Sequence, residues 1–288
     1  MVMKKVFWII LCLFFYFPVV FAGNMKLHYE RPAEYFEEAL VIGNGTMGAT
    51  LYGGVKKDKI SFNDITLWTG EPESENSSPD AFNVIPEIRA LLDNEDYQGA
   101  DKAQYKVQGH YSENYQPLGT LTIEYLDDTA GISDYHRWLD IGNATARTQY
   151  LKDGKLFTSD YFASAPDSVI VIRLKSENKE GIHASLSFDS PLPHSSQVAD
   201  NEISVEGYAA YHSFPVYYKA EDKHRYDPER GIHFKTLVRV LSVDGSVKDR
   251  YSDSRIEIDG STEVLILIAN VTSFNGFDKD PVKEGRNY

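Results

Sequence analysis

The amino-acid sequence predicts a mainly β protein, a large antiparallel β-sandwich interrupted by a short two-helix insertion. Three observations lead to this expectation. More than a dozen short segments alternate apolar and polar residues, Asp-Gly turn signals separate several of them, and strand and helix patterns do not alternate regularly. The hydrophobic fraction of 42% and the charged fraction of 25% are those of a folded globular chain.

The predicted strands show their alternation most clearly in 120–126, TLTIEYL, where Thr122 and Glu124 would lie on one face and apolar residues on the other. Asp153-Gly154, Asp244-Gly245 and Asp259-Gly260 have the composition of two-residue hairpin turns. The full set of predicted strands is 25–30, 39–42, 49–52, 59–62, 65–68, 120–126, 145–151, 155–162, 168–175, 183–188, 202–205, 231–243, 254–258 and 263–271.

One stretch has helical spacing instead. Asp80 is a suitable N-cap for a helix that would place Ile85, Ile88 and Leu91 on one face. Pro86 within this segment predicts a late start or a kink. A second helical segment is expected at about 94–107, so the two helices form an insertion between β regions.

Residues 1–22 have the features of a secretory signal peptide. Two lysines precede an apolar run over 6–21, and Ala22 completes a small-x-small cleavage pattern. The run is shorter than the roughly 20 residues of a membrane span, and an uncleaved anchor is the alternative. The single cysteine, Cys12, lies in this leader, so the mature chain would have no disulfide. We expect a secreted or periplasmic protein with no membrane segment after cleavage.

The net charge of the chain indicates which partners it can bind. The chain carries 29 Lys and Arg against 43 Asp and Glu, a formal net charge of −14. Such an acidic protein repels phosphate backbones, so no nucleic-acid partner is expected. The aromatic content of 13% suits β-structure, sugar-binding surfaces and ordinary cores alike.

No motif indicates a cofactor or a metal. Residues 43–48, GNGTMG, fit the G-x-G-x-x-G pattern, but a short strand pattern and Gly53-Gly54 follow where a dinucleotide-binding loop needs a helix. These glycines are expected to serve tight turns, and no cofactor is predicted. The eight histidines show no H-x-x-x-H spacing, so no metal site is predicted, and no G-x-S-x-G nucleophile elbow occurs.

Acidic residues beside an aromatic side chain are the remaining chemical signal. Asp64, Glu71 and Glu73 flank Trp68, an arrangement typical of sugar-binding sites. It is also typical of a strand end followed by a solvated loop, which is the commoner case. Glycoside hydrolysis needs two carboxylates at a fixed separation, and spacing among 43 acids cannot identify such a pair.

A set of short motifs follows in order along the chain. They are Pro32-Ala33, Glu38-Ala39-Leu40, Ile42-Gly43-Asn44-Gly45, Gly48, Gly53-Gly54, Asn63, Leu67-Trp68, Gly70, 115–119 (YQPLG), 135–140 (YHRWLD), 161–164 (YFAS), 167–174 (DSVIVIRL) and 269–274 (ANVTSF). Together they resemble the N-terminal part of glycoside hydrolase family 95, the secreted α-L-fucosidases. The sequence departs from the family pattern at Phe36, Val41, Asp64 and Thr120, where the family usually has Trp, Pro, Glu and Asp.

The resemblance implies an antiparallel β-super-sandwich over 23–275 and, in 276–288, the start of a connector to a helical (α/α)6 barrel that this sequence does not match. In the family that barrel carries the carboxylates for inverting hydrolysis of fucosylated glycans. None of them maps onto this chain, so no catalytic residue is assigned. Whether the chain is an enzyme stays open, and we expect no turnover from it alone. A free-standing carbohydrate-binding or scaffold module is the alternative, and a truncated gene product without function is a third reading.

Four residues in the most family-like segments are candidates for substrate contact: Asn63, Asp64, Trp68 and Gln116. A structural role is the alternative for each of them. Trp68 could be a core side chain, and Asn63 could form the hydrogen bonds of a turn.

Overall fold

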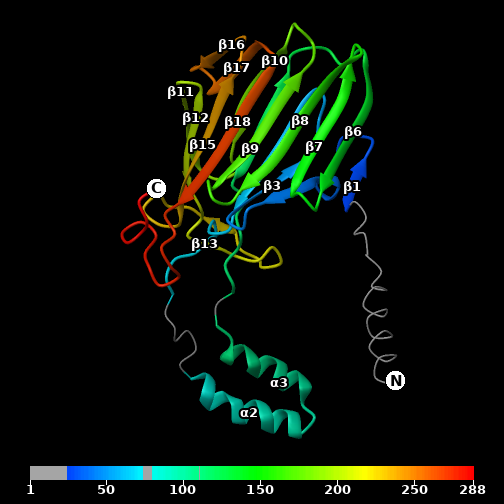
Figure 1. Ribbon diagram of the computed structural model, residues 1–288. Helices are drawn as coiled ribbons and strands as arrows, with labels where there is room; N and C mark the ends of the chain where they lie inside the picture. The colour runs from blue at the N-terminus through cyan, green and yellow to red at the C-terminus, as the bar shows by residue number, and fades with distance from the viewer. Residues whose placement is uncertain (1–24, 74–79, 110) are drawn as a thin grey trace, which may run out of the picture.

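The structure is a computed structural model that describes residues 25–73, 80–109 and 111–288. The predicted signal peptide, 1–22, lies outside the described residues. Two antiparallel sheets face each other, one of nine strands in the order β1-β6-β7-β8-β9-β18-β15-β12-β11 and one of seven in the order β16-β17-β10-β5-β4-β3-β2 (Figure 1). The predicted fold class, mainly β with a two-helix insertion, is confirmed.

The strands and helices of the described chain follow the predicted order, with additions. They are β1 Lys26–Tyr29, η1 Phe36–Glu38, β2 Leu40–Gly43, β3 Met47–Leu51, β4 Lys57–Asp64, α2 Ala81–Asp93, α3 Tyr97–Gln104, η2 Tyr105–Val107, β5 Gly119–Tyr125, β6 Ile132–Asp140, β7 Thr145–Lys152, β8 Lys155–Ser164, β9 Val169–Ser176, β10 Ile182–Asp189, β11 His194–Ala199, β12 Glu202–Tyr208, β13 His212–Ser213, β14 His224–Arg225, β15 His233–Ser242, β16 Ser246–Arg250, β17 Arg255–Ser261 and β18 Glu263–Thr272.

The core lies between the inner faces of the two sheets. Burial alternates along β5 and β18, so that Leu121 and Ile123 of one sheet and Ile266 and Ile268 of the other are fully buried. These side chains belong to one continuous hydrophobic cluster. Each buried aliphatic side chain contributes roughly 1.5–3 kcal/mol of transfer free energy, which makes this packing the main stabilising term.

The hairpin turns predicted at the three Asp-Gly pairs are confirmed in one case and wrong in two. Asp153-Gly154 joins the paired strands β7 and β8, as predicted. The other two predictions are wrong, because Asp244-Gly245 connects strands of different sheets and Asp259-Gly260 lies within β17. The Asp244 carboxylate accepts hydrogen bonds from the Thr262 backbone N–H at 2.6 Å and from its hydroxyl at 2.7 Å. This aspartate therefore fastens together two crossovers between the sheets rather than closing a hairpin.

Some strands departed from the prediction. Residues 65–68 form a turn after β4 with a single bridge from Trp68 to Tyr115, not a strand. The strands β6, β11, β13, β14 and β16 were not predicted from alternation. In β6 a register shift between Ser133 and His136 disrupts the period of two, so burial along it does not alternate.

The glycine-rich segment 43–48 is a hairpin between β2 and β3, and no helix follows it. The Asn44 carboxamide oxygen accepts hydrogen bonds from the backbone N–H groups of Thr46 and Met47, which shapes the turn. A side chain at Gly54 would collide with the Lys57 carbonyl. The architectural role predicted for these glycines is confirmed.

The helices α2 and α3 form a hairpin that Figure 1 shows apart from both sheets. Asp80 occupies the N-cap position of α2, but its side chain makes no capping hydrogen bond, whereas the Asp96 side chain caps α3 by accepting from Gly99 N. Pro86 lies inside α2. Within the described chain, none of the helices has the length and apolar character needed to cross a membrane.

The carboxyl group of Asp58 is buried between the sheets. Asp58 on β4 is 1% exposed, and its carboxylate accepts hydrogen bonds from the Tyr161 hydroxyl on β8 and from Gly54 N, each at 2.8 Å. Burial raises the pKa of Asp58 to about 6, and the hydrogen bonds only partly offset that rise. The folded state thus holds this proton more tightly than the unfolded chain does.

The replacement Asp58→Asn tests this assignment. Because the folded pKa lies above the usual value of 3.8, the proton's contribution to stability is complete below about pH 4 and is lost as the pH rises to about 6. Over that window the unmodified protein should lose about 3 kcal/mol of unfolding free energy relative to D58N. Urea unfolding at several pH values measures the difference, with the exposed Asp93→Asn as control. A D58N pH profile parallel to that of the unmodified protein would contradict it.

Candidate functional site

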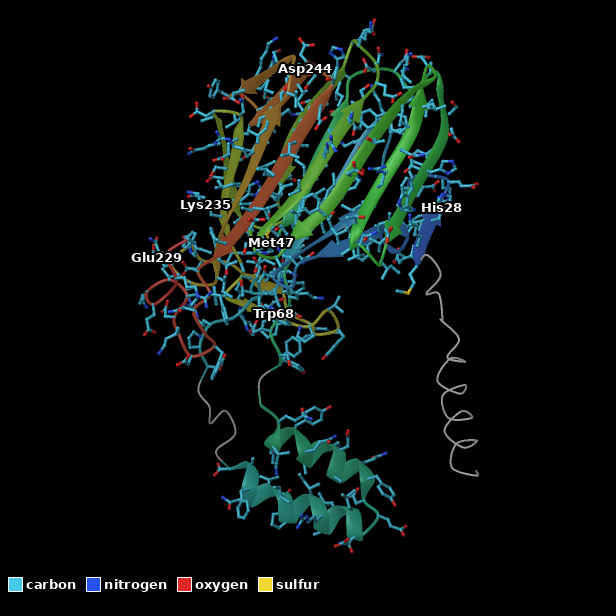
Figure 2. All side chains as sticks on the ribbon, in the orientation of Figure 1. His28, Met47, Trp68, Glu229, Lys235 and Asp244 are labelled. Atoms are coloured by element: carbon cyan, nitrogen blue, oxygen red, sulfur yellow. The ribbon has the colours of Figure 1, made fainter. Side chains whose placement is uncertain are left out.

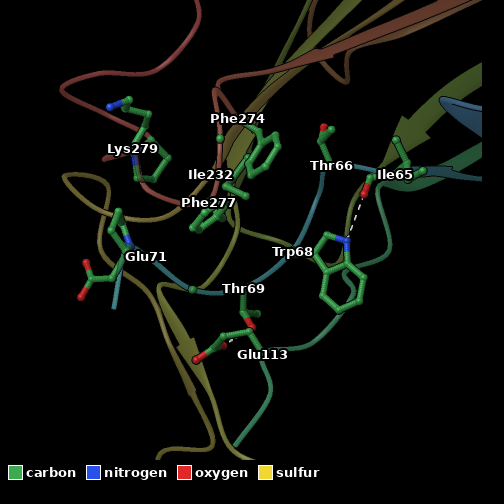
Figure 3. Close-up of a pocket in the computed structure, with 14 residues that line it drawn as sticks. Ile65, Thr66, Trp68, Thr69, Glu71, Glu113, Ile232, Phe274, Phe277 and Lys279 are labelled. Carbon is green, nitrogen blue, oxygen red and sulfur yellow. Dashed lines mark hydrogen bonds between the residues drawn. The ribbon is translucent and has the colours of Figure 1, made fainter. Parts of the chain in front are cut away.

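A cavity of about 510 Å³ lies at the end of the sandwich where the loops after β4 and after β18 meet (Figure 3). Aromatic and aliphatic groups form most of its wall, including Trp68, Phe274 and Phe277. Glu71 and Glu113 are the carboxylates in the wall, and Lys279 adds an ammonium group. Concave apolar sites with a few polar groups are typical of small-molecule binding.

Trp68 is held in the wall by a short turn. Leu67 beside it is fully buried and anchors the turn in the core. The Trp68 ring is 43% exposed, and its indole N–H donates to the Ile65 carbonyl at 3.0 Å. The Tyr115 ring lies 5.3 Å from it at an angle of 55°. The indole therefore offers a ring face to the solvent, while its only donor is already used.

Asp64 links the two sheets beneath this turn. It is 6% exposed, and one oxygen accepts from the Thr66 N–H at 2.9 Å and from the Thr66 hydroxyl. Its other oxygen accepts from the Asn270 amide of β18 at 2.9 Å. The side-chain oxygen of Asn270 in turn accepts a hydrogen bond from the Thr236 hydroxyl of β15 at 2.8 Å. Since both oxygens have partners within the protein, the geometry assigns Asp64 to holding the loop.

Asn63 and Gln116 lie next to the turn but do not line the cavity. The Asn63 amide donates to the Gln116 carbonyl at 3.3 Å, and the Gln116 N–H donates to the Leu67 carbonyl at 2.9 Å. The fold thus brings together all four predicted contact residues, and only Trp68 among them reaches the cavity. Substrate contact by the other three stays a prediction that this geometry does not favour.

Both wall carboxylates are occupied by protein partners. Glu71 forms a two-pronged ion pair with the Arg230 guanidinium, one contact being 2.8 Å from Nε. Glu113 accepts from His212 Nδ1 at 2.8 Å, from Ser213 N at 3.2 Å and from the Thr69 hydroxyl. The arrangement therefore suits binding better than proton transfer.

Neither Glu113 nor Phe277 was expected in a site. Glu113 lies in a polar loop with no motif, and Phe277 lies in the segment predicted to be a connector. A phenylalanine within that otherwise polar segment was the available signal for Phe277. Glu73, predicted beside Trp68, does not line the cavity.

The described residues near the cavity suit neither a serine nucleophile nor a bound metal ion. The Ser213 hydroxyl lies 2.8 Å from His224 Nδ1, but Ser213 is 1% exposed and so is inaccessible as a nucleophile. Among the described cavity residues no three side chains gather as metal ligands.

The structure is thus a two-sheet antiparallel β-sandwich domain whose loop end carries a cavity with aromatic rings beside carboxylates. A protein-family model described as "Glycosyl hydrolase family 65, N-terminal domain" matches residues 27–276. The chain belongs to this domain family.

The chain is also similar to curated relatives. It is 28% identical to "Alpha-L-fucosidase 2" of Arabidopsis thaliana, over 88% of this chain and 31% of the relative. It is 28% identical to "Probable alpha-fucosidase A" of Aspergillus niger over 88% and 31%, and 23% identical to a protein of the same name from Aspergillus oryzae over 83% and 32%. The chain spans about a third of the length of these relatives. The resemblance to the N-terminal part of α-L-fucosidases is confirmed. The family model that matches the chain is that of family 65, whereas the sequence motifs resemble family 95.

The hydrogen bond between Asp64 and Asn270 is expected to contribute to the free energy of unfolding. Asp64→Ala leaves the Asn270 amide and the Thr66 N–H without their acceptor in a buried place, so unfolding free energy should fall by about 2–4 kcal/mol. In a double-mutant cycle with Asn270→Ala, the two losses should be less than additive by about 1 kcal/mol or more. Chemical denaturation measures both, and Asp93→Ala on the helix surface is the control. Fully additive losses would show that the pair does not interact.

Proposed function

We propose that this chain is the N-terminal β-sandwich domain of a secreted α-L-fucosidase-type glycoside hydrolase that degrades fucosylated glycans. The observation that carries the proposal is the similarity to proteins named as α-fucosidases over 88% of this chain. In this proposal the domain supports the catalytic part of the enzyme, and the acid and base of an inverting hydrolysis belong to that part. Export follows from the signal-peptide pattern in 1–22.

The saturated carboxylates support a non-catalytic role for the domain by itself. An inverting glycosidase needs one carboxylic acid to protonate the leaving oxygen and one carboxylate to activate water, about 6.5–9.5 Å apart. Glu71 is paired with Arg230, and Glu113 has three donors around it. Either glutamate would have to break these contacts before it could transfer a proton or activate water.

A carbohydrate-binding role of the domain itself is the second candidate, and a specific observation favours it. The exposed face of Trp68 and the 83% exposed ring of Phe277 both border the cavity. The apolar face of a pyranose ring can stack on such a side chain, while its hydroxyls reach polar groups at the rim such as Lys279.

The absence of turnover is directly testable. The purified protein incubated with 2′-fucosyllactose should release no more fucose than buffer does, because both carboxylates among the described cavity residues, Glu71 and Glu113, are held by protein partners. Fucose is measured by coupled dehydrogenase absorbance or by chromatography, with an active α-L-fucosidase as the positive control. Clear fucose release that scales with protein concentration would refute the non-catalytic role.

Binding can be tested separately from turnover. Titration with fucosylated oligosaccharides, followed by tryptophan fluorescence or by calorimetry, should give weak saturable binding that Trp68→Ala reduces by about tenfold or more, since roughly 1.4 kcal/mol of stacking is lost. Trp138→Ala, on the outer face of β6, is the matched control and should bind as the unmodified protein does. Equal binding by W68A and the unmodified protein would remove the cavity from the proposal.

Export has its own test. Expression of the full sequence in a secreting host should yield a protein that begins at Gly23, because cleavage is expected after Ala22. N-terminal sequencing of the secreted fraction reads the cleavage position, and Ala22→Arg should block cleavage. Retention of the 1–22 segment on a membrane-bound protein would favour the anchor instead.

A further inference from the structure

Three metal-ligating side chains gather at the edge of the nine-stranded sheet. His28 and Glu30 come from β1 and the residue after it, and His136 comes from β6. One potential ligand atom of each lies within 4.8 Å of the others. Figure 2 places His28 on the edge strand, away from the Trp68 loop. Across 25–73, 80–109 and 111–288, no other group of three His, Cys, Asp or Glu side chains meets this condition.

Strand pairing explains the cluster. β1 and β6 are antiparallel, with His28 opposite Trp138 and Tyr29 opposite Arg137. Side chains alternate between the faces of a sheet, so Arg137 enters the buried interior while His28, His136 and Trp138 project from the outer face. Glu30 is the first residue after β1, and its carboxylate lies within 4.8 Å of the ligand atoms of His28 and His136.

The His136 ring is oriented by a neighbouring carboxylate. Its Nε2 lies 3.0 Å from an Asp134 oxygen, within hydrogen-bond distance of a carboxylate that can accept a proton from that nitrogen. Its Nδ1 is shielded from solvent and has no hydrogen-bond partner within the described protein. The backbone around Asp134 is unusual, with a φ of 52° beside the register shift in β6. A carboxylate that holds one imidazole nitrogen while the other faces a metal is a common second layer of metal sites.

We propose that His28, Glu30 and His136 bind a zinc ion on the outer face of the β1–β6 edge. Two imidazoles and one carboxylate suit Zn²⁺, whereas Ca²⁺ and Mg²⁺ require mainly oxygen ligands. Tetrahedral zinc places neighbouring ligand atoms about 3.3–3.5 Å apart. The exposed side chains of His28 and Glu30 can rotate to close the present spacing, and a water molecule completes the tetrahedron.

The zinc ion would stabilise the position of β1, which makes few other contacts. All four residues of β1 are exposed, and β6 is its only neighbour in the sheet. Lys26, on the same strand, is paired with Asp140 at 3.4 Å. Zinc that binds only the folded state stabilises it in proportion to the logarithm of the zinc concentration above the dissociation constant. The inference is independent of the proposed glycosidase function.

The experiment uses the purified protein without a histidine tag, stripped with a chelator. Zinc titrated by calorimetry or against a chromophoric competitor should bind one ion per chain and raise the melting temperature. His28→Ala and His136→Ala should each weaken binding at least tenfold, and Asp134→Asn should weaken it about tenfold. Co²⁺ in place of zinc should give the visible absorption of a tetrahedral site, and Ca²⁺ should give no stabilisation.

His183→Ala is the matched control. Its side chain is 31% exposed, close to the 30% of His136, and it pairs with Asp259 on the other sheet. This variant should bind zinc as the unmodified protein does. Circular dichroism of the zinc-free variants checks that each is folded. The proposal is overturned if zinc does not bind, or if H28A and H136A keep the affinity and stoichiometry of the unmodified protein.

Discussion

The hydrogen bond between the Asp64 carboxylate and the Asn270 amide ties the two sheets together at the end that carries the cavity. β4 and β18 belong to different sheets, so no backbone ladder can connect them. The same aspartate shapes the turn through Thr66, whose hydroxyl also meets the Thr272 hydroxyl at 2.6 Å. The position of Trp68 in the cavity wall therefore depends on a polar contact buried among apolar side chains.

Two other buried polar groups show the same principle. Asp58 binds Tyr161 across the interior, and Arg137 donates to the carbonyls of Arg31 at 2.8 Å and Glu38 at 2.9 Å. Burial lowers the pKa of Arg137, and the Tyr29 ring lies 4.2 Å from its guanidinium. Burying such groups costs free energy unless every donor and acceptor is satisfied. Their value lies in fixing where segments distant in sequence meet, which non-directional apolar packing cannot do.

The sequence predicts what local periodicity determines. Alternation located most strands because burial of one face imposes a period of two, and it missed β6 because a register shift breaks that period. The hairpin prediction was wrong at Asp244-Gly245, because residues that close hairpins also suit a chain reversal between two sheets. It was wrong at Asp259-Gly260 because that pair continues strand β17. Trp68 lines the cavity, and its contact with a substrate stays a prediction. Glu113 and the partners of His28 depend on pairings between distant strands and loops, which no spacing along the chain records.

The exposed aromatic ring at the loop end lies beside a cavity, whereas those on the helices do not line it. This difference indicates what kind of partner each ring could contact. Trp68 borders a concave wall with charged groups nearby, and its indole donor is already used. A single sugar ring needs only such a face and a few polar neighbours. Phe82 and Tyr105, on and just after the helices, are exposed by 82% and 63%, and neither of them lines the cavity. Stable protein interfaces bury about 800 Å² on each side, far more than isolated rings supply. The cavity beside Trp68 therefore has the shape and chemistry that a small ligand needs.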